Sequence, residues 1–183
     1  DGLVSGLLFI GSAVIFSLSL FTKYYQPEVA VLCAMLAGSA LGFLIFNFYP
    51  AKIFLGEGGS TLAGFMLGVL AVISGGKIAT AVLVLGLPLL DLVWVVCRRM
   101  FKEKKSPFVG DRSHLHFRLL DLGFSHRGAV LLFYALAASF GFSALFLQSM
   151  GKLVALGVLV GIMALLSAGL MLVYGKRDRV IKK

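Results

Sequence analysis

Long apolar runs constrain this chain more than any other feature of its sequence. The first two, Leu3–Phe21 and Val29–Phe46, contain no charged residue. A helix needs roughly 20 apolar residues to cross about 30 Å of hydrocarbon, because lipid offers no hydrogen-bond partner to an exposed backbone. Six stretches reach or approach that length, which predicts an all-α polytopic membrane protein with six transmembrane helices in a single membrane domain, residues 1–183. The predicted helices are Leu3–Phe21, Val29–Phe46, Thr61–Ser74, Ile78–Val96, Gly128–Leu147 and Leu153–Tyr174.

The composition supports this class and excludes others. Hydrophobic residues make up 60% of the chain and charged residues 14%, against about 45–50% and about 25% in a soluble domain. A soluble enzyme, a disordered tail and a disulfide scaffold are therefore excluded, and Cys33 and Cys97 both lie within apolar runs. The net charge of +9 is typical of the cytoplasmic loops of a membrane protein, so we expect no nucleic-acid partner.

The basic residues also predict an orientation. If the long polar segment 98–127 is cytoplasmic, the alternation of helices places both termini and the loop 47–60 on the same side. Of the 17 Lys and Arg residues, only Lys23, Lys77 and Lys152 then fall on the other side. Because cytoplasmic loops are enriched in Lys and Arg, we expect cytoplasmic N- and C-termini and two functional cytoplasmic loops, 47–60 and 98–127.

The loop 47–60 has the character of a phosphate or metal site. Its segment Gly56–Ser60 reads Gly-Glu-Gly-Gly-Ser, and we expect Ser60 to cap a helix that Thr61 opens. A glycine-rich turn entering a helix N-terminus offers free N–H groups to an anion. Glu57 adds a hard oxygen of the kind that Mg²⁺ prefers. The alternative interpretation is an ordinary interfacial turn with a solvated glutamate.

Asp91 is a carboxylate inside the fourth apolar run, three residues after Pro88. An acid within a transmembrane segment is costly and usually faces the protein interior, a partner or an aqueous cavity. The proline frees a backbone carbonyl and can kink the helix nearby. The alternative is that Asp91 reaches the interface or pairs with Arg98 or Arg99.

The segment 106–118 brings together groups that bind phosphate or exchange protons. These groups are Asp111, Arg112, His114, His116 and Arg118. A His-x-His pair also ligates transition metals, although neither a cysteine nor a third histidine is close by. We interpret the more distant His126 as a solvated loop residue.

Helical spacing makes the end of this segment amphipathic. If Ser113 caps a short helix, its apolar and polar residues separate onto two sides. One side would carry Leu115, Leu119 and Leu122, and the other His114, Arg118 and Asp121. Such a helix would lie in the membrane interface with its apolar side down, and the alternative function is the binding of anionic lipid alone.

In combination these blocks resemble the polyprenyl-phosphate N-acetylhexosamine-1-phosphate transferases, bacterial membrane enzymes distantly related to phospho-N-acetylmuramoyl-pentapeptide transferase. Asp1–Gly6 resembles the end of the family's Asn-x-x-Asp-Gly-x-Asp-Gly motif, and Asn47–Ser60 resembles its Phe-Met-Gly-Asp-x-Gly-Ser loop. Ser106–Leu119 resembles its His-x-His-His loop, and Pro88 and Asp91 fit the stretch before it. The likeness runs in order along nearly the whole chain.

The resemblance implies a reaction at the bacterial inner (plasma) membrane, with the active site on the cytoplasmic face. A sugar 1-phosphate, by default N-acetylglucosamine 1-phosphate, would pass from a UDP-sugar to undecaprenyl or another polyprenyl phosphate, giving a polyprenyl-diphosphate sugar and UMP. Such a product begins cell-wall or surface glycan synthesis. Mg²⁺ is the implied metal, with Mn²⁺ as the alternative.

Site residues carry over position by position. Glu57 occupies the position of the family's metal-binding Asp. The residues implied in the reaction are Asp1, Asp111, His114 and His116. The residues implied in substrate binding are Asn47, Phe54, Gly56, Asp91, Arg112 and Arg118, with Phe54 stacking on uracil.

Several departures accompany the resemblance. Glu57 is one methylene longer than the usual Asp, and Phe117 stands where the second His of an adjacent pair would be. The chain begins at Asp1 with neither a basic segment nor a small-residue cleavage site, so the first helix does not have the pattern of a signal peptide. We expect a C-terminal fragment of a longer transferase that lacks about five helices and the family's Asp-Asp pair, and that is inactive alone.

Two other functions compete with the transferase. A non-catalytic protein that binds polyprenyl phosphate, or that scaffolds glycan assembly, is motivated by Glu57 and Phe117. A small transporter is motivated only by Asp91 and Pro88, and no inverted repeat supports it. Small residues in the last two helices leave a homodimer open, since such residues serve internal packing equally well.

Overall fold

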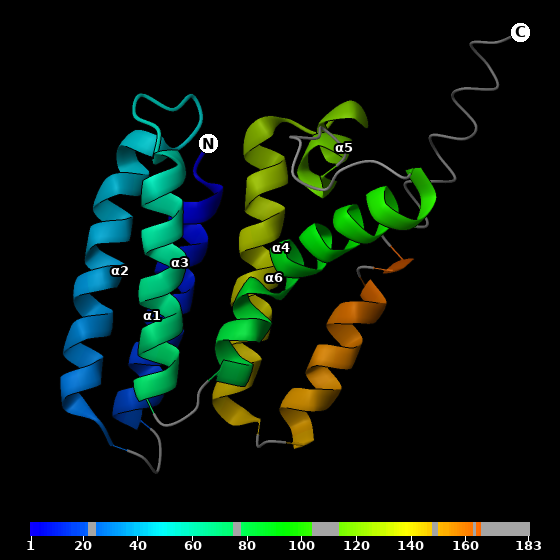
Figure 1. The fold of residues 1–183 in the computed structure, drawn as a ribbon. Helices are drawn as coiled ribbons and strands as arrows, with labels where there is room; N and C mark the ends of the chain where they lie inside the picture. Colours follow the sequence, from blue (N-terminus) through cyan, green and yellow to red (C-terminus); the bar gives the residue numbers. More distant parts are fainter. Residues whose placement is uncertain (22–24, 75–77, 104–113, 148–149, 163, 166–183) are drawn as a thin grey trace, which may run out of the picture.

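Every element in the described part of this computed structural model is helical (Figure 1). The structure describes residues 1–21, 25–74, 78–103, 114–147, 150–162 and 164–165. The long helices are α1 (Leu3–Phe21), α2 (Pro27–Asn47), α3 (Gly56–Ile73), α4 (Ile78–Cys97) and α6 (His126–Phe146). A π-helical extension, Arg98–Glu103, follows α4, and the short α5 (Leu115–Asp121) precedes α6. A further apolar helix, Met150–Ile162, carries no label.

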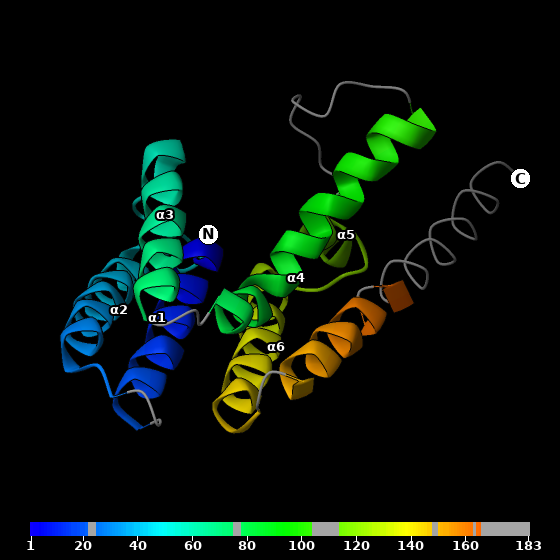
Figure 2. The same ribbon diagram turned by 60° about the horizontal axis from the view of Figure 1, so that its bottom comes forward.

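Successive long helices run in alternating directions (Figure 1). The start of α1, the connection between α2 and α3, and α5 all lie at the upper end of the bundle in Figure 1. Figure 2 shows α1, α2 and α3 grouped together, while α4 crosses obliquely against α6. We call the upper end the site end, because the candidate residues at Asp1, in 47–57 and in α5 gather there.

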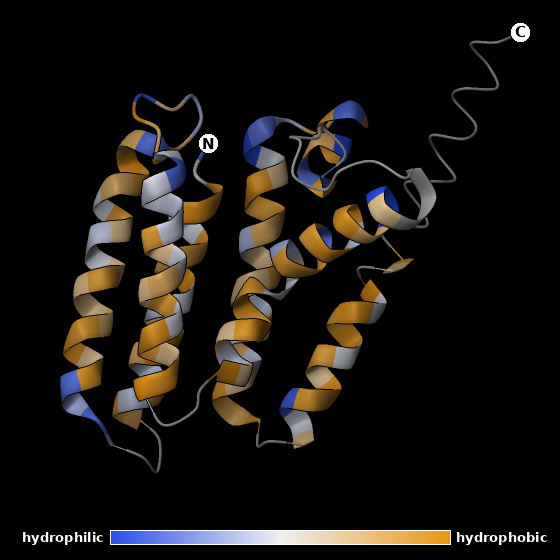
Figure 3. Cartoon of the chain, viewed as in Figure 1, coloured by the Kyte–Doolittle hydropathy of each residue, from blue (hydrophilic) through white to orange (hydrophobic). Residues whose placement is uncertain are grey.

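The described helices confirm a multi-pass membrane protein. Four of them, α1, α2, α3 and α6, are long and apolar enough to cross a membrane, and the two parts of α4 add a fifth span if they are counted as one. Figure 3 shows hydrophobic colour along these helices, with hydrophilic residues mostly near their ends. The sixth predicted span, Leu153–Tyr174, lies partly outside the described residues, so the number six stays a prediction.

Pro88 marks a sharp change of direction in α4. The parts on either side, Ile78–Gly86 and Pro88–Met100, are bent by 70°. A proline inside a helix removes one backbone hydrogen bond and clashes with the preceding turn, which explains a kink at this place. The kink expected from the sequence is therefore present, and the segment after it carries Asp91.

Helix α3 begins earlier than the sequence predicts. It starts at Gly56, which has a φ of +71°, and not at Thr61. Ser60 is not the cap, because its hydroxyl donates to the carbonyl of Glu57 within the helix at 2.9 Å. The physical reason is that glycine tolerates the left-handed backbone conformation that residue 56 has at the start of this helix. The glycine-rich segment is thus the first turn of α3, and it presents Glu57 at the site end.

Helices α1 and α2 make the most extensive contact of any pair. On α1 the buried residues include Ser5, Ser12 and Ser19, spaced seven apart. On α2 they include Ala30, Cys33, Ala37 and Ala40. Small side chains let helix backbones approach closely in a membrane, where packing rather than water expulsion holds helices together.

Candidate functional site

Asn47 ties the start of α1 to the loop ahead of α3. Its Oδ1 accepts hydrogen bonds from the Gly2 N–H and the Ser5 hydroxyl, each at 2.9 Å. Its Nδ2 donates to the Ile53 carbonyl at 2.9 Å, and the residue is buried. These bonds occupy both acceptor directions of the amide oxygen, so the predicted substrate contact would have to use the remaining Nδ2–H.

Tyr49 joins the same loop to α6. Its ring stacks on His126 with centroids 4.5 Å apart and planes 1° from parallel. The Arg127 Nε–H donates to the Tyr49 carbonyl at 2.9 Å. The interpretation of His126 as a solvated loop residue is incomplete: its side chain is exposed, but it begins α6 and takes part in this stack. The sequence did contain a signal that α6 begins at His126. Ser125 precedes it, and the Ser125 hydroxyl caps α6 by accepting the Gly128 N–H at 3.0 Å.

Asp91 is buried and holds the first residues of α5. Its Oδ1 accepts the Leu115 N–H at 2.8 Å, and its Oδ2 forms a hydrogen bond with His114 Nδ1 at 2.9 Å. Of the three surroundings expected for this carboxylate, the protein interior, a partner or an aqueous cavity, the structure shows the interior. The expected substrate contact of Asp91 stays a prediction. Both carboxylate oxygens already have protein partners, so a substrate would have to share them.

Helix α5 packs on α6 by its apolar side. Leu115 and Leu119 are buried in one cluster with Ala129 and Phe133 of α6. The expectation that α5 lies in the membrane interface stays a prediction, but Leu115 and Leu119 face α6 and not the lipid. Leu122, expected on the same side, is exposed, and Ser113 lies outside the described residues.

The two histidines of the His-x-His pair lie close together. The rings of His114 and His116 have centroids 5.9 Å apart and planes within 14° of parallel, and His116 also contacts Phe117 at 4.1 Å between centroids. Burial, together with the charge of the neighbouring His114, lowers the pKa of His116, while Asp91 opposes that change. His116 therefore keeps its neutral form at a lower pH than an exposed histidine does.

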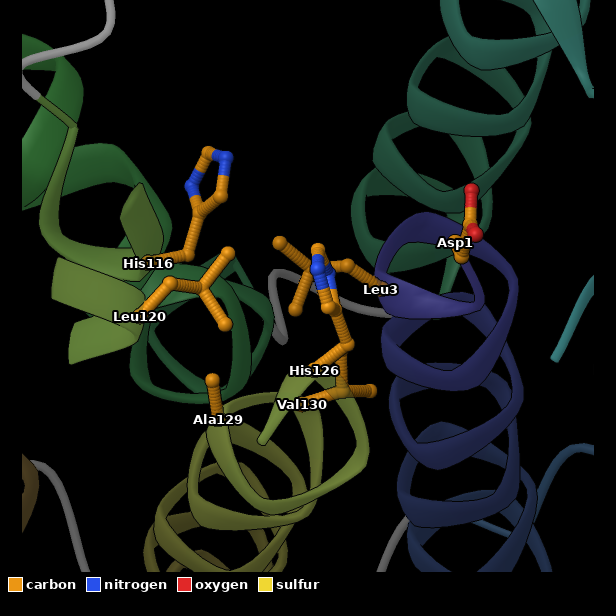
Figure 4. Close-up of a pocket in the computed structure, with 7 residues that line it drawn as sticks. All are labelled: Asp1, Leu3, His116, Leu120, His126, Ala129 and Val130. Carbon is orange, nitrogen blue, oxygen red and sulfur yellow. The ribbon is translucent and has the colours of Figure 1, made fainter. Parts of the chain in front are cut away.

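A cavity of about 90 Å³ lies where α1, α5 and α6 meet (Figure 4). Its polar residues are Asp1, which precedes α1, His116 of α5 and His126 of α6, and its remaining lining is apolar. Figure 4 shows His116 and Asp1 on opposite sides, with the His126 ring between them. The Asp1 carboxylate also lies 3.5 Å from the Ala51 N–H. The structure thus brings Asp1 and His116 to one cavity, and adds His126.

Glu57 belongs to a different hollow. This open region of about 570 Å³ is lined by residues of α3 alone, Glu57, Gly58, Thr61, Leu62 and Phe65. Phe54, just before α3, is 73% exposed, as a ring that stacks on a ligand must be. No heavy atom lies within 4 Å of a Cβ added to Gly56, so there is room for a ligand on that side of its backbone.

The metal-binding expectation rests on Glu57 alone. Within the described ranges no group of three or more His, Cys, Asp or Glu side chains is placed to hold a metal ion. A single exposed carboxylate fits a Mg²⁺ site of the kind that uses one or two carboxylates and is completed by substrate phosphates. Asp111 and Arg112 lie outside the described residues, and Arg118 is half-buried on α5 with an interaction of its own.

Fold and site together define a multi-pass helical membrane protein with histidines, carboxylates and an exposed aromatic ring at one end of its bundle. Comparison with known sequences supports the family resemblance. Residues 1–75 match the profile of glycosyl transferase family 4. The resemblance stated from the motifs is confirmed by this match and by the named relatives.

Named relatives align with most of the chain. A probable undecaprenyl-phosphate N-acetylglucosaminyl 1-phosphate transferase of Bacillus subtilis is 35% identical over 155 residues, covering 81% of this chain and 42% of the relative. A decaprenyl-phosphate N-acetylglucosaminephosphotransferase of Mycobacterium leprae is 39% identical, covering 73% and 39%. An undecaprenyl-phosphate alpha-N-acetylglucosaminyl 1-phosphate transferase of Escherichia coli is 32% identical, covering 75% and 40%. The chain thus spans about two fifths of their length, and no solved structure matches it.

Proposed function

We propose that the full-length protein containing this chain transfers N-acetylglucosamine 1-phosphate from a UDP-sugar to polyprenyl phosphate. The observation that carries the proposal is the alignment of 81% of the chain with a relative named for this transfer. Its physical support is the site end, where groups suited to phosphate, an exposed ring and a glycine-opened helix N-terminus occur together.

The proposed reaction is a phosphoryl substitution. An oxygen of the lipid phosphate attacks the sugar-bearing phosphorus of the UDP-sugar, and the bond from that phosphorus to the bridging oxygen breaks. UMP leaves with this oxygen, and the products are polyprenyl-diphosphate N-acetylglucosamine and UMP. Because both reactants are anionic, the protein's main tasks are to hold them in line and to screen their charge.

The candidate residues divide these tasks. The histidines His114 and His116, with Arg118, suit the diphosphate, and Phe54 suits the uracil ring. Asp111 and Arg112 complete the same group by their place in the sequence. Mg²⁺, when bound, would be held by Glu57 with substrate phosphates and would neutralise phosphate charge.

The membrane arrangement is part of the proposal. We infer six spans, with the site end in the bacterial cytoplasm and the protein in the inner membrane. The support is the concentration of Lys and Arg in the segments expected on that side. A UDP-sugar is a cytoplasmic nucleotide, so a donor site on this face agrees with the reaction.

The test is turnover by the full-length protein in lipid nanodiscs. UDP-N-acetylglucosamine and polyprenyl phosphate are supplied with Mg²⁺, and UMP and lipid-linked sugar are both measured. We expect the two products in equal amounts, and no UMP when the lipid phosphate is omitted. UDP-N-acetylgalactosamine and UDP-glucose, tested in parallel, define the sugar specificity.

Glu57 is tested by substitution. Glu57→Ala should reduce turnover by about 10²-fold or more, in the range seen when one transition-state charge contact is removed, and Glu57→Asp should keep activity with an altered Mg²⁺ dependence. Glu28→Ala is the matched control, because Glu28 is an exposed glutamate in the first turn of α2, at the opposite end. Unchanged turnover in Glu57→Ala would remove Glu57 from the metal role.

The second candidate is a non-catalytic protein that binds polyprenyl phosphate or scaffolds glycan assembly. Glu57 in place of an aspartate and Phe117 in place of a histidine are the observations that favour it. It predicts binding of lipid phosphate without release of UMP. Any lipid-dependent UMP release by the full-length protein would exclude it.

A further inference from the structure

We propose that Asp91 is a positioning residue that acts through His114, holding its imidazole with Nδ1 protonated so that Nε2 faces the substrates as an acceptor. This inference rests on the proposed function, which supplies a phosphate for Nε2 to meet. It assigns Asp91 a role different from the direct substrate contact that the sequence suggests.

Two hydrogen bonds determine the tautomer. The Leu115 backbone N–H can only donate, so Oδ1 of Asp91, 2.8 Å away, accepts from it. The other oxygen, Oδ2, lies 2.9 Å from His114 Nδ1. An ionised carboxylate has no proton to give, so the proton of this bond is on Nδ1. In the neutral imidazole Nε2 is then an unprotonated acceptor.

Burial makes the pair asymmetric. The Asp91 side chain is 9% exposed and that of His114 is 29% exposed. The carboxylate is therefore shielded from a ligand, while part of the imidazole is open at the site end. Within the described residues no other side chain bonds the His114 ring.

The same carboxylate caps α5. His114 precedes the helix in an extended conformation and makes no side-chain cap bond, so Asp91 of α4 takes the first helical N–H instead. A negative charge at a helix N-terminus is favourable, and a buried carboxylate needs such partners. Asp91 thus holds His114 in two ways, through the bond to its ring and through the bond to the backbone of the next residue, Leu115.

Fixing Nε2 as an acceptor has a chemical use in the proposed reaction. A phosphate monoester with a second pKa near 6 carries a proton part of the time at neutral pH. That proton moves to Nε2 as the phosphate oxygen attacks, and the resulting imidazolium keeps its Nδ1–H bond to Asp91. No other reactant is needed.

The variant Asp91→Asn distinguishes two roles of Asp91, setting the tautomer of His114 and merely holding His114 and α5 in place. The Leu115 N–H still requires an acceptor, so the amide oxygen must face Leu115 and the amide NH₂ must face His114. The new donor forces Nδ1 to accept, which moves the ring proton to Nε2. Size, burial and both hydrogen bonds are retained, while the nitrogen facing the substrate changes from acceptor to donor.

The experiment uses the full-length protein in nanodiscs. We expect Asp91→Asn to lower kcat by about 10²–10⁴-fold, as loss of a correctly protonated acid–base group does, with KM for both substrates within about threefold. Asp91→Asn should add nothing in a His114→Ala background. Glu28→Gln, the same carboxylate-to-amide change at an exposed position of α2 at the opposite end, is the control and should match the unmodified protein.

A second readout is independent of activity. In protein labelled with ¹⁵N-histidine, the His114 signals, assigned by their loss in His114→Ala, should report Nδ1–H, and Asp91→Asn should convert them to Nε2–H. An unchanged tautomer, an unchanged kcat, or a rise in KM alone would overturn the inference. If the unmodified protein released no UMP, the proposed function would fail, while the tautomer would still decide whether Asp91 orients His114.

Discussion

Asn47 shows how single polar residues hold the site end together. Its three hydrogen bonds join Gly2, Ser5 and Ile53, which come from the start of α1 and the loop before α3. Each partner is a backbone or hydroxyl group that is costly to leave unpaired when buried.

Asn47→Ala should therefore lower the free energy of unfolding by about 1–3 kcal/mol, the cost of leaving buried polar groups unsatisfied. The measurement is unfolding of the full-length protein in detergent. Ser39→Ala serves as the control, because the exposed Ser39 bonds only the Met35 carbonyl of its own helix. Equal stability of the two variants would contradict the role given to Asn47.

His116 makes stability depend on pH. Burial and His114 lower its pKa below the usual 6.5, so the unfolded chain takes up this proton at a higher pH than the folded protein does. As pH falls below about 6.5, protonation therefore favours unfolding, and the stability lost increases until the folded-state pKa is passed.

We expect the thermal unfolding midpoint to decrease when the pH is lowered from 7.5 to 5.5. The decrease should be smaller in His116→Gln, which has no titrating ring. The difference between the two proteins removes the contribution of other titrating groups. Parallel slopes for both would show that the environment of His116 does not penalise its charge.

At the scale of elements, α1 is fitted closely to α6. A Cβ added to Gly6 would lie 2.0 Å from the Tyr134 ring, and the Tyr134 hydroxyl in turn donates to the Gly2 carbonyl. A side chain at position 6 must therefore displace both the ring and its hydrogen bond.

Gly6→Ala should lower the free energy of unfolding by about 1–3 kcal/mol, the usual cost of overpacking. Gly38→Ala, within α2 and with nothing inside 4 Å of its added Cβ, should change stability by no more than about 1 kcal/mol. Thermal unfolding of the two alanine variants, measured side by side, checks the prediction. A Gly6→Ala variant as stable as Gly38→Ala would refute it.

The loop between α2 and α3 is held by a ring stack as well as by Asn47. Removing the stack in Tyr49→Ala should cost about 0.5–1.5 kcal/mol and speed backbone hydrogen exchange in 48–55 by roughly two- to tenfold. Tyr49→Phe keeps the ring, and the Arg127 bond goes to the backbone carbonyl, so exchange should stay as in the unmodified protein. If hydrogen exchange in 48–55 were as slow in Tyr49→Ala as in the unmodified protein, the stack would not be needed and Asn47 alone would order the loop.

At the scale of the whole molecule, the proposed orientation can be tested with two single cysteines. In a background of Cys33→Ala and Cys97→Ser, Lys52→Cys lies at the site end, and Met150→Cys follows α6 at the other end. An impermeant maleimide should label Lys52→Cys only in inverted vesicles and Met150→Cys only in right-side-out vesicles. The reverse pattern would invert the topology.

The sequence predicts local features of this molecule better than long-range ones. Leu3–Phe21 is recovered with the same bounds, because a long apolar run has few alternatives in a membrane. Gly56–Ser60 is misassigned, since glycine suits both a turn and a helix entry and only the backbone angle decides. The buried position of Asp91 is predictable, but its partner His114, 23 residues away, is fixed by packing that no local pattern contains. The helical position of His126 had a local signal in the Ser125 cap, but its stack on Tyr49 is a long-range contact that no local pattern contains.

The cap that α4 provides for α5 has a consequence for how the protein is made. The ribosome delivers Asp91 before His114 and Leu115, so for a time the carboxylate exists without either partner. A lone charge at membrane depth is unfavourable, and the second half of α4 therefore has reason to wait outside the lipid until α5 emerges.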